Sequence, residues 1–313
     1  MKKLLSIVVP VYFNEASLPT TIPTLMELVK QLPEMDGELL FVDDGSRDSS
    51  WDILCEYRGK FPDVISIVKL SRNFGSMAAI TAGLAEAKGD CAVFISADLQ
   101  DPPELIHTMV EKWKCGARVV IASRESREEG LVQRLLSGGF YWLFRKLALP
   151  AFPEGGFDFC LIDRKVIDVV IRSCEKNIHL PALIFWTGFD PVIIPYCRRK
   201  RRHGRSRWTF AKKIKLFIDS FVSFSYAPIR FLSVCGFVLF GVAVLYSIAQ
   251  IAARVIYGVS VPGFSTIVIL IASTSGLQML LLGVVGEYLW RTFDEARSRP
   301  MYIVDQVIKT ERE

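Results

Sequence analysis

Short apolar runs alternate with amphipathic stretches over about the first 125 residues of the chain. We expect strands at residues 4–13, 38–44, 64–71, 91–96 and 118–124, where Val, Ile and Leu run together. We expect helices at residues 18–31, 50–60, 76–88 and 104–116. Apolar strands that are separated by helices indicate a parallel sheet that is buried on both faces. The pattern therefore predicts the α/β fold class, with a mostly parallel sheet and flanking helices.

Two long uncharged runs follow near the C-terminus, at Phe231–Ala253 and Val255–Gly286. A helix that spans a membrane needs about 20 apolar residues. We therefore expect two transmembrane helices, at about residues 231–256 and 264–288. The N-terminal apolar run is short, β-branched and interrupted by Pro10, so it predicts a first strand rather than a signal peptide.

Basic residues are unevenly distributed around these runs. Residues 198–215 are strongly basic, and Arg291, Arg297 and Arg299 follow the second run, whereas the connector YGVSVPGF at residues 257–264 has no basic residue. The positive-inside rule places both termini in the cytoplasm. We expect an integral protein of the inner or plasma membrane, with a cytoplasmic domain at 1–210, a juxtamembrane basic segment at 211–230, two spans within 231–290 and a cytoplasmic tail at 291–313.

The net charge of +5 is modest and comes mainly from the basic segment. This segment adjoins an apolar run and lacks a nucleic-acid recognition fold, so it favours anionic lipid or a lipid-linked phosphate over nucleic acid. Aromatic and basic residues are mixed at 133–149, which predicts either a core helix or an amphipathic helix on the membrane surface. The seven cysteines have no metal-ligand spacing, which indicates reduced thiols in a cytosolic compartment.

Polar residues follow every strand that the pattern predicts. They are Asn14-Glu15, Asp43-Asp44-Gly45-Ser46, Arg72-Asn73, Asp98-Leu99-Gln100 and Arg124. Ligands of parallel sheets bind beyond the carboxyl ends of the strands, so these residues predict a site for a phosphate ester with a cation. Asp101 precedes two prolines and is expected to cap the next helix. The sequence has no Walker loop and no GxGxxG, which excludes an ordinary nucleotide-binding fold.

Several of these segments together carry a resemblance to a known family. They are SIVVPVYFNEASL, FVDDGSRDSS, LSRNFGSMAAITAGLAEAKGD, SADLQDPPE, FCLIDR and RRHGRSRW. Their order and spacing resemble family 2 glycosyltransferases of the GT-A fold, in particular dolichyl-phosphate mannose synthase and the bacterial membrane-anchored polyprenyl-phosphate glycosyltransferases. The resemblance implies a Rossmann-like GT-A sheet. It also implies inverting transfer of a sugar from a UDP-sugar, with glucose as the first guess, to a polyprenyl (undecaprenyl) phosphate.

The resemblance implies a Mg²⁺ or Mn²⁺ ion held by Asp98 and Gln100. Ser96 stands where the family often has a first Asp, and a hydroxyl is a weaker ligand than a carboxylate for such a hard cation. This departure leaves one alternative open, a non-catalytic membrane-anchored scaffold with a degenerate metal site. A processive polysaccharide synthase is excluded, because the sequence lacks a Gln-x-x-Arg-Trp element and has too few spans for a sugar channel.

The resemblance also implies roles for the other strand-end residues. Residues near the donor nucleotide and diphosphate are Pro10, Tyr12, Glu15, Asp43, Asp44, Arg72 and Asn73. Simpler structural roles stay open for four of them: a turn at Asp43 or Asp44, a helix-start charge at Glu15 and a solvated guanidinium at Arg72. Asp158 faces the acceptor by resemblance, as a base or as an orienting group. A polyprenyl phosphate has a second pKa of roughly 6 and needs little deprotonation.

The acceptor phosphate requires positive charge near the membrane surface. Its candidate residues are Arg124, Arg127, Arg134, Ser137, Arg202, Ser206 and Arg207. Arginine suits this role because its planar fork matches phosphate oxygens. Two spans cannot flip a lipid-linked sugar, so a separate flippase and a downstream transferase are expected partners. The spacing of Gly236 and Gly241 favours helix–helix contact and predicts a homo-oligomer.

Overall fold

The computed structural model describes residues 2–32, 34–124, 157–173, 179–199 and 263–311, together with separate positions within 138–153 and 231–256. The chain divides into two compact units. Unit 1 comprises Met1–Ser220 and Pro300–Glu313, and unit 2 comprises Phe221–Arg299. The segment 211–230 and most of the aromatic segment 133–149 lie outside the described residues.

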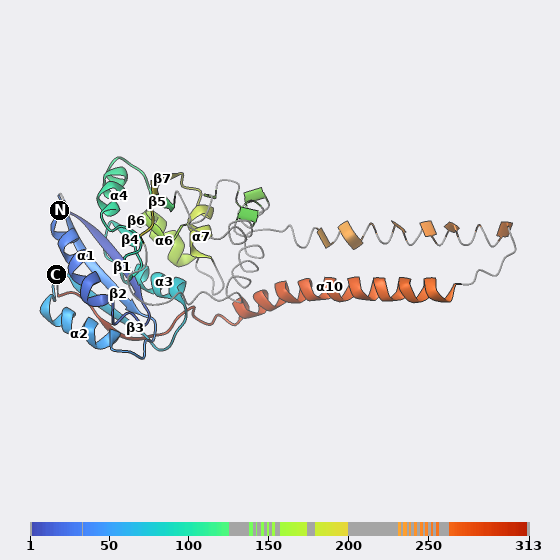
Figure 1. The fold of residues 1–313 in the computed structure, drawn as a ribbon, viewed down its shortest axis with the longest axis horizontal. Helices are drawn as coiled ribbons and strands as arrows, with labels where there is room; N and C mark the ends of the chain where they lie inside the picture. The colour runs from blue at the N-terminus through green and yellow to red at the C-terminus, as the bar shows by residue number, and fades with distance from the viewer. Residues whose placement is uncertain are drawn as a thin grey trace. The chain divides into compact units, whose positions relative to one another are not determined.

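Unit 1 is built around one mixed sheet with the strand order β7-β5-β6-β4-β1-β2-β3-β8 among the described residues (Figure 1). The strands are β1 (Lys3–Val11), β2 (Met35–Asp43), β3 (Ile65–Leu70), β4 (Cys91–Phe94), β5 (Val119–Arg124), β6 (Phe159–Asp163), β7 (Pro191–Tyr196) and β8 (Val304–Ile308). Strands β4, β1, β2 and β3 are parallel neighbours. Strand β6 is antiparallel to both β4 and β5, and β8 is antiparallel to β3.

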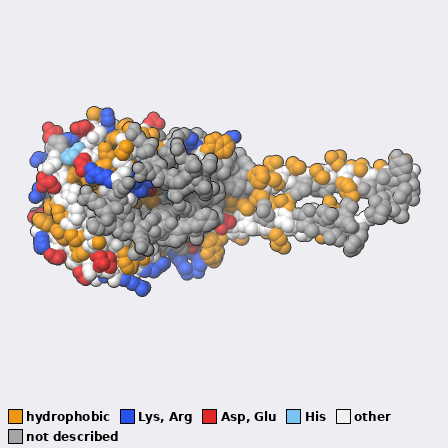
Figure 2. All heavy atoms as spheres, in the orientation of Figure 1, with side chains coloured by type: hydrophobic (Ala, Val, Ile, Leu, Met, Phe, Trp, Pro, Cys, Tyr) orange, Lys and Arg blue, Asp and Glu red, His pale blue; other side chains and the backbone are white. Residues whose placement is uncertain are grey.

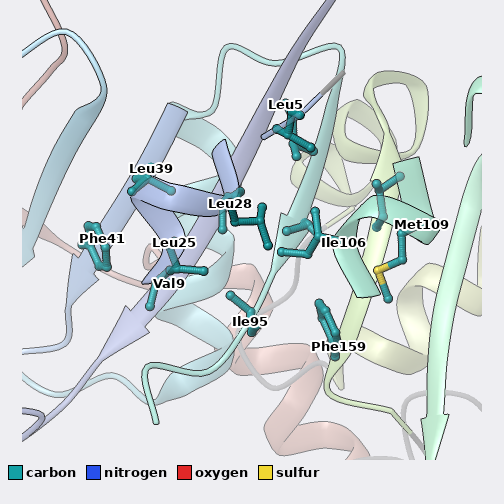
Figure 3. Close-up of a cluster of buried hydrophobic side chains, with 14 of the residues drawn as sticks. Leu5, Val9, Leu25, Leu28, Leu39, Phe41, Ile95, Ile106, Met109 and Phe159 are labelled. Atoms are coloured by element: carbon teal, nitrogen blue, oxygen red, sulfur yellow. The ribbon is translucent and has the colours of Figure 1, made fainter. Parts of the chain in front are cut away.

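Helices cover both faces of this sheet. They are α1 (Leu18–Lys30), α2 (Ser50–Lys60), α3 (Ser76–Glu86), α4 (Leu105–Lys114), α6 (Arg164–Arg172) and α7 (Leu180–Trp186). Helices α1, α2 and α4 share one large apolar core with the sheet, of which Figure 3 shows Leu5, Leu25, Phe41, Ile106 and Phe159. Helix α3 packs on β1, β2 and β3, and α6 packs on β4, β6 and α7. The sheet is therefore buried on both faces, as parallel sheets generally are.

Helix α3 lies unusually close to the sheet at Gly83. A Cβ atom at this position would lie 2.3 Å from Val8 Cγ1 and 3.1 Å from Val42 Cγ2. Both valines belong to the central strands β1 and β2. The glycine thus sets the distance between α3 and the strands whose carboxyl ends carry candidate site residues.

The α/β class and the mostly parallel sheet are confirmed. The predicted strands and helices of the first 125 residues appear as β1 to β5 and α1 to α4. The pattern did not predict the strands β6, β7 and β8. Strand β8 places part of the C-terminal tail in the sheet of unit 1, where Thr310 N–H also donates to Ser66 Oγ at 2.9 Å.

Unit 2 contains the long helix α10 (Phe264–Ala296). Large apolar side chains are exposed on this unit, such as Leu245, Val255, Met279 and Leu282 (Figure 2). Among the described residues, no helix meets the combined length and hydropathy that a membrane crossing requires. The two transmembrane helices therefore remain a prediction.

Candidate active site

The topology brings the candidate residues to one edge of the sheet. Strands β1 to β4 end at this edge because they are parallel, and β5 ends there because antiparallel β6 separates it from β4. The register pairs Ala122 with Phe159, so the start of β6 lies beside the end of β5. Asp158 thus reaches the edge from an antiparallel strand, whereas Arg124 reaches it from the end of β5.

The segment after β1 is tied to the segment after β2. Phe13 N–H donates to Ser46 Oγ at 3.0 Å, and Tyr12 N–H donates to Asn14 Oδ1 at 2.8 Å. Phe13 has a φ of 55°, in the left-handed region that a non-glycine residue rarely adopts. Backbone strain of this kind persists only where surrounding contacts hold it. Pro10 lies within β1, opposite Val42 of β2.

Glu15 supports the start of α2 in this structure. Its Oε2 accepts the N–H of Ser49 at 3.1 Å, and its own N–H donates to Asp48 Oδ2 at 3.3 Å. Residue 49 is the N-cap of α2, so the carboxylate lies beside the positive end of a helix. Glu15 thus has a structural contact at the start of α2 rather than at the helix that follows it, and a nucleotide contact stays a prediction.

Asp44 fixes the loop that follows β3. Its Oδ1 accepts the N–H of Phe74 at 2.7 Å, and its Oδ2 accepts Asn73 Nδ2 and the N–H of Gly75, both at 2.9 Å. The side chain is almost fully buried. Burial raises the pKa of Asp44 to about 6, although the two backbone donors oppose this shift. Asp44 therefore shapes the loop that carries Asn73 and the exposed Arg72.

Asp43 closes the turn after β2. Both of its carboxylate oxygens lie 3.3 Å from the N–H of Ser46, and burial raises its pKa. Gly45 has a φ of +68°, and a Cβ there would lie 2.5 Å from the carbonyl carbon of Arg72. The turn thus requires a glycine. Arg72 itself stacks on Phe74, with its guanidinium carbon 4.2 Å from the ring centroid.

The loop after β4 carries the candidate metal ligands. Ser96 Oγ donates to Asp98 Oδ1 at 2.7 Å, and the N–H of Gln100 donates to the same oxygen at 3.3 Å. Leu99, between the two candidate ligands, has a strained φ of 47°. Among the described residues, no group of three or more His, Cys, Asp or Glu side chains could hold a metal. Mg²⁺ commonly binds through one or two carboxylates plus substrate phosphates, so Asp98 and Gln100 fit such an ion.

Arg124 and Asp158 form an ion pair at the same edge. Arg124 Nη2 lies 2.5 Å from Asp158 Oδ2, and the two side chains are 12% and 57% exposed. The Nε of Arg124 donates to Tyr196 Oη at 3.3 Å. A predicted acceptor-phosphate residue and a predicted acceptor-facing carboxylate are thus direct neighbours.

Asp101 does not cap α4, which corrects the prediction from the sequence. The N-cap position of α4 is Glu104. The side chain of Asp101 is fully buried and contacts Tyr196 and Arg198 instead. Its Oδ1 accepts the hydroxyl of Tyr196 and lies 3.4 Å from Arg198 Nε. Burial raises the pKa of Asp101, and the charge of Arg198 opposes this shift. The sequence could not reveal this contact, because Tyr196 lies 95 residues further along the chain.

The start of the basic segment contacts the loop of the candidate metal ligands. The N–H of Arg199 donates to the carbonyl oxygen of Gln100 at 2.9 Å, and its guanidinium pairs with Glu104 at 3.1 Å. The remaining predicted acceptor residues lie outside the described residues. They are Arg127, Arg134, Ser137, Arg202, Ser206 and Arg207.

The structure is an α/β fold whose candidate site lies at the carboxyl edge of its sheet. A family model described as "Glycosyl transferase family 2" matches residues 6–169, and the chain belongs to this family. It is therefore a glycosyltransferase, as the motifs indicated.

Three similar proteins extend this comparison. A Bacillus subtilis (strain 168) protein named "Uncharacterized glycosyltransferase YkcC" is 40% identical, over 96% of this chain and 93% of its own length. A "Prophage bactoprenol glucosyl transferase homolog" of Escherichia coli (strain K12) is 34% identical, over 97% and 99%. The solved glucosyl-3-phosphoglycerate synthase of Mycobacterium tuberculosis, in complex with Mn²⁺, UDP-glucose and glycerol 3-phosphate, has a TM-score of 0.47 and 19% identity, over 70% of this chain and 76% of that one.

Proposed function

We propose that this glycosyltransferase transfers glucose from UDP-glucose to a polyprenyl phosphate, with undecaprenyl phosphate as the expected acceptor. The observation that carries the proposal is the convergence of Asp98 and Gln100 with the Arg124–Asp158 pair at one sheet edge. The name of the Escherichia coli relative supports both the sugar and the lipid acceptor. In the reaction, an oxygen of the acceptor phosphate forms a bond to the anomeric carbon, and the bond from that carbon to UDP breaks with inversion.

The donor side of the proposed site lies between the ends of β1, β2, β3 and β4. Asp98 and Gln100 would hold a Mg²⁺ or Mn²⁺ ion, which would neutralise the charge that develops on the leaving diphosphate. We place the uridine near Asp43 and Asp44, and the diphosphate near Arg72 and Asn73 of the Asp44-bound loop. Pro10, Tyr12 and Glu15 would line the base pocket on the other side.

The acceptor side is proposed at Arg124 and Asp158. The guanidinium of Arg124 can bind phosphate oxygens through paired donors. Its carboxylate partner, Asp158, is more than half exposed, can accept hydrogen bonds from the sugar hydroxyls, and can orient the phosphate through its pairing with Arg124. The phosphate is already anionic near neutral pH, so a general base contributes little to this reaction. Asp158 is therefore proposed as an orienting residue first and as a base second.

Membrane attachment through residues 231–256 and 264–288 belongs to the same proposal. The chain leaves unit 1 before residue 221 and returns to it at residue 300, and β8 then joins the sheet at residues 304–308. Both ends of unit 2 therefore continue into one folded unit, so any crossing of a membrane occurs an even number of times. The uncharged runs and the basic flanks support two spans with a cytoplasmic active site. A separate flippase, a downstream transferase and a homo-oligomer remain proposed partners.

A transfer assay tests the proposed function. Purified protein in detergent receives radiolabelled UDP-glucose, undecaprenyl phosphate and Mn²⁺, and label is counted in the organic phase. We expect label that disappears with EDTA and with Asp98→Ala, while the exposed Asp52→Ala on α2 serves as the matched control. Label with another UDP-sugar would correct the sugar alone. Absence of label with every UDP-sugar, from folded protein, would refute the proposal.

A further inference from the structure

Two buried side chains connect the Arg124–Asp158 pair to the loop after β4. Asp101 is fully buried, and Tyr196 is 5% exposed. The hydroxyl of Tyr196 donates to Asp101 Oδ1 and accepts a hydrogen bond from Arg124 Nε at 3.3 Å. Asp101 directly follows Gln100, one of the candidate metal ligands. A continuous set of hydrogen bonds thus runs from the donor side of the site to Asp158 on the acceptor side.

We propose that Asp101 and Tyr196 are positioning residues, which fix the guanidinium of Arg124 and, through it, the carboxylate of Asp158 for the transfer step. This inference rests on the proposed function, because it assigns roles within that same reaction. Neither side chain is proposed to touch the substrates, since both are buried.

The hydroxyl of Tyr196 restricts the orientation of Arg124. A guanidinium is a rigid planar fork, so a hydrogen bond at Nε also determines where the two Nη atoms point. In this structure Nη2 points to Asp158, and Arg124 is the side chain in the described part of the chain that donates a hydrogen bond to that carboxylate. Since Asp158 is largely exposed, loss of this donor would leave its side chain free to take other rotamers.

A buried carboxylate at position 101 costs more free energy than a purely structural contact with Tyr196 would require. Its Oδ2 is buried and has no hydrogen-bond partner in the described part of the chain, which costs free energy in the folded state. Arg198 Nε lies 3.4 Å from the other carboxylate oxygen, Oδ1. The same region also holds Arg199 against the carbonyl of Gln100, at 2.9 Å. Asp101 therefore joins three parts that the reaction must bring together: the metal loop, the Arg124–Asp158 pair and the start of the basic segment.

Tyr196→Phe tests the inference directly. The ring keeps its edge-to-face packing on Phe159, whose centroid is 6.4 Å away, and only the hydroxyl is lost. We expect kcat to fall roughly tenfold, since small misplacements of reacting groups carry costs of this order and above. The KM for UDP-glucose and the half-saturating Mn²⁺ concentration should stay within about twofold, because the donor ligands keep their contacts. Tyr57→Phe removes a hydroxyl from α2, which carries no candidate site residue, and should leave kcat unchanged.

A double substitution separates positioning from a general loss of structure. In the Arg124→Met background, Tyr196→Phe should reduce kcat by less than about twofold, because its effect passes through the guanidinium already removed. A further tenfold loss in that background would overturn the inference. An unchanged kcat in the single Tyr196→Phe variant would also overturn the inference. The proposed function would stand in that case, because the wild type is active. An inactive wild type would overturn the proposed function, and this inference with it.

Asp101 provides a second pair of variants should Tyr196→Phe fail to fold. Asp101→Asn keeps an oxygen that can accept the Tyr196 hydroxyl, whereas the similarly sized Asp101→Leu does not. We expect Asp101→Leu to lose at least about fivefold more kcat than Asp101→Asn, with the same KM for UDP-glucose in both. Equal kcat values in the two variants would overturn the inference.

Discussion

At the scale of single residues, the carboxylates of the candidate site differ in the groups that surround them. Both carboxylate oxygens of Asp44 accept hydrogen bonds from the loop of Asn73, Phe74 and Gly75. Asp98 accepts the hydroxyl of Ser96 and the N–H of Gln100 through Oδ1. The two carboxylates look alike in the sequence, since each stands at the end of a strand. Their different surroundings lead to different predictions.

The burial of Asp44 predicts a specific pH dependence of stability. Its pKa of about 6 in the folded protein exceeds the ordinary value of 3.8, so between these values the folded state binds more protons than the unfolded state. The contribution of Asp44 to the free energy of unfolding therefore falls as the pH rises from about 4 to 6. Asp44→Asn removes this contribution, so the stability of the wild type relative to the variant should fall across that window.

Thermal unfolding followed by intrinsic fluorescence, at several pH values from 4 to 8, measures this difference. Asp52→Asn, at an exposed position of α2, controls for the loss of a carboxylate. If the unfolding midpoints of the wild type and Asp44→Asn change in parallel over the whole pH range, the pKa of Asp44 is not raised.

Ser96 predicts how the site responds to metal. In Ser96→Asp, a second carboxylate joins Asp98, and cation affinity rises with the charge of the ligands, so the half-saturating Mn²⁺ concentration should fall about tenfold. Without metal the two carboxylates repel each other and the Ser96–Asp98 hydrogen bond is lost, so the unfolding midpoint should drop. Activity and thermal unfolding, each titrated with Mn²⁺, give both quantities. Ser96→Asn is the uncharged control, and identical Mn²⁺ dependence in the two variants would count against a cation beside Asp98.

At the scale of elements, the turn after β2 connects two site-bearing loops. Gly45 combines a φ of +68° with a backbone contact, since a Cβ would lie 2.5 Å and 2.8 Å from the carbonyl carbon and Cα of Arg72. Gly116, after α4, has a φ of +104° but no atom within 4 Å of its Cβ position. A comparison of the two glycines therefore separates the cost of a positive φ from the cost of steric overlap.

Gly45→Ala should therefore destabilise the protein more than Gly116→Ala. Both variants place an alanine at a positive φ, but only Gly45→Ala also forces the loop after β3 to move, and overpacking of this kind costs about 1–3 kcal/mol more. Chemical denaturation of both variants measures the difference. Equal losses would mean that the loop at Arg72 can shift without cost.

The elements also show why the sequence predicted some parts and not others. Strands β1 to β5 are continuous apolar runs between amphipathic helices, and that periodicity is local. Strand β7 begins with Pro191, contains Pro195 and is only partly buried, so its pattern is not that of a buried strand. Strand β8 is short and mostly exposed, and it forms only because β3 offers a free edge. Asp101 and Tyr196 were missed for the same reason, since their contact depends on topology rather than on spacing.

At the scale of the whole molecule, strand β8 constrains how unit 2 can be inserted in a membrane. Residues 304–308 pair with β3, and Arg58 Nη2 donates to the carbonyl of Lys309 at 2.7 Å. The end of the chain is therefore part of the same sheet as its beginning. A membrane can separate the connector near residues 257–262 from unit 1, but it cannot separate the two termini from each other.

This constraint predicts the labelling pattern of single cysteines in intact cells. In a variant without the native cysteines, Ser260→Cys should react with a membrane-impermeant thiol reagent added from outside. Glu311→Cys and Lys2→Cys, which flank the sheet at the two ends of the chain, should react only after the membrane is permeabilised. If all three positions react only after permeabilisation, residues 231–288 do not cross the membrane. If Glu311→Cys alone reacts from outside, the number of crossings is odd, and β8 cannot pair with β3 in the membrane-bound protein.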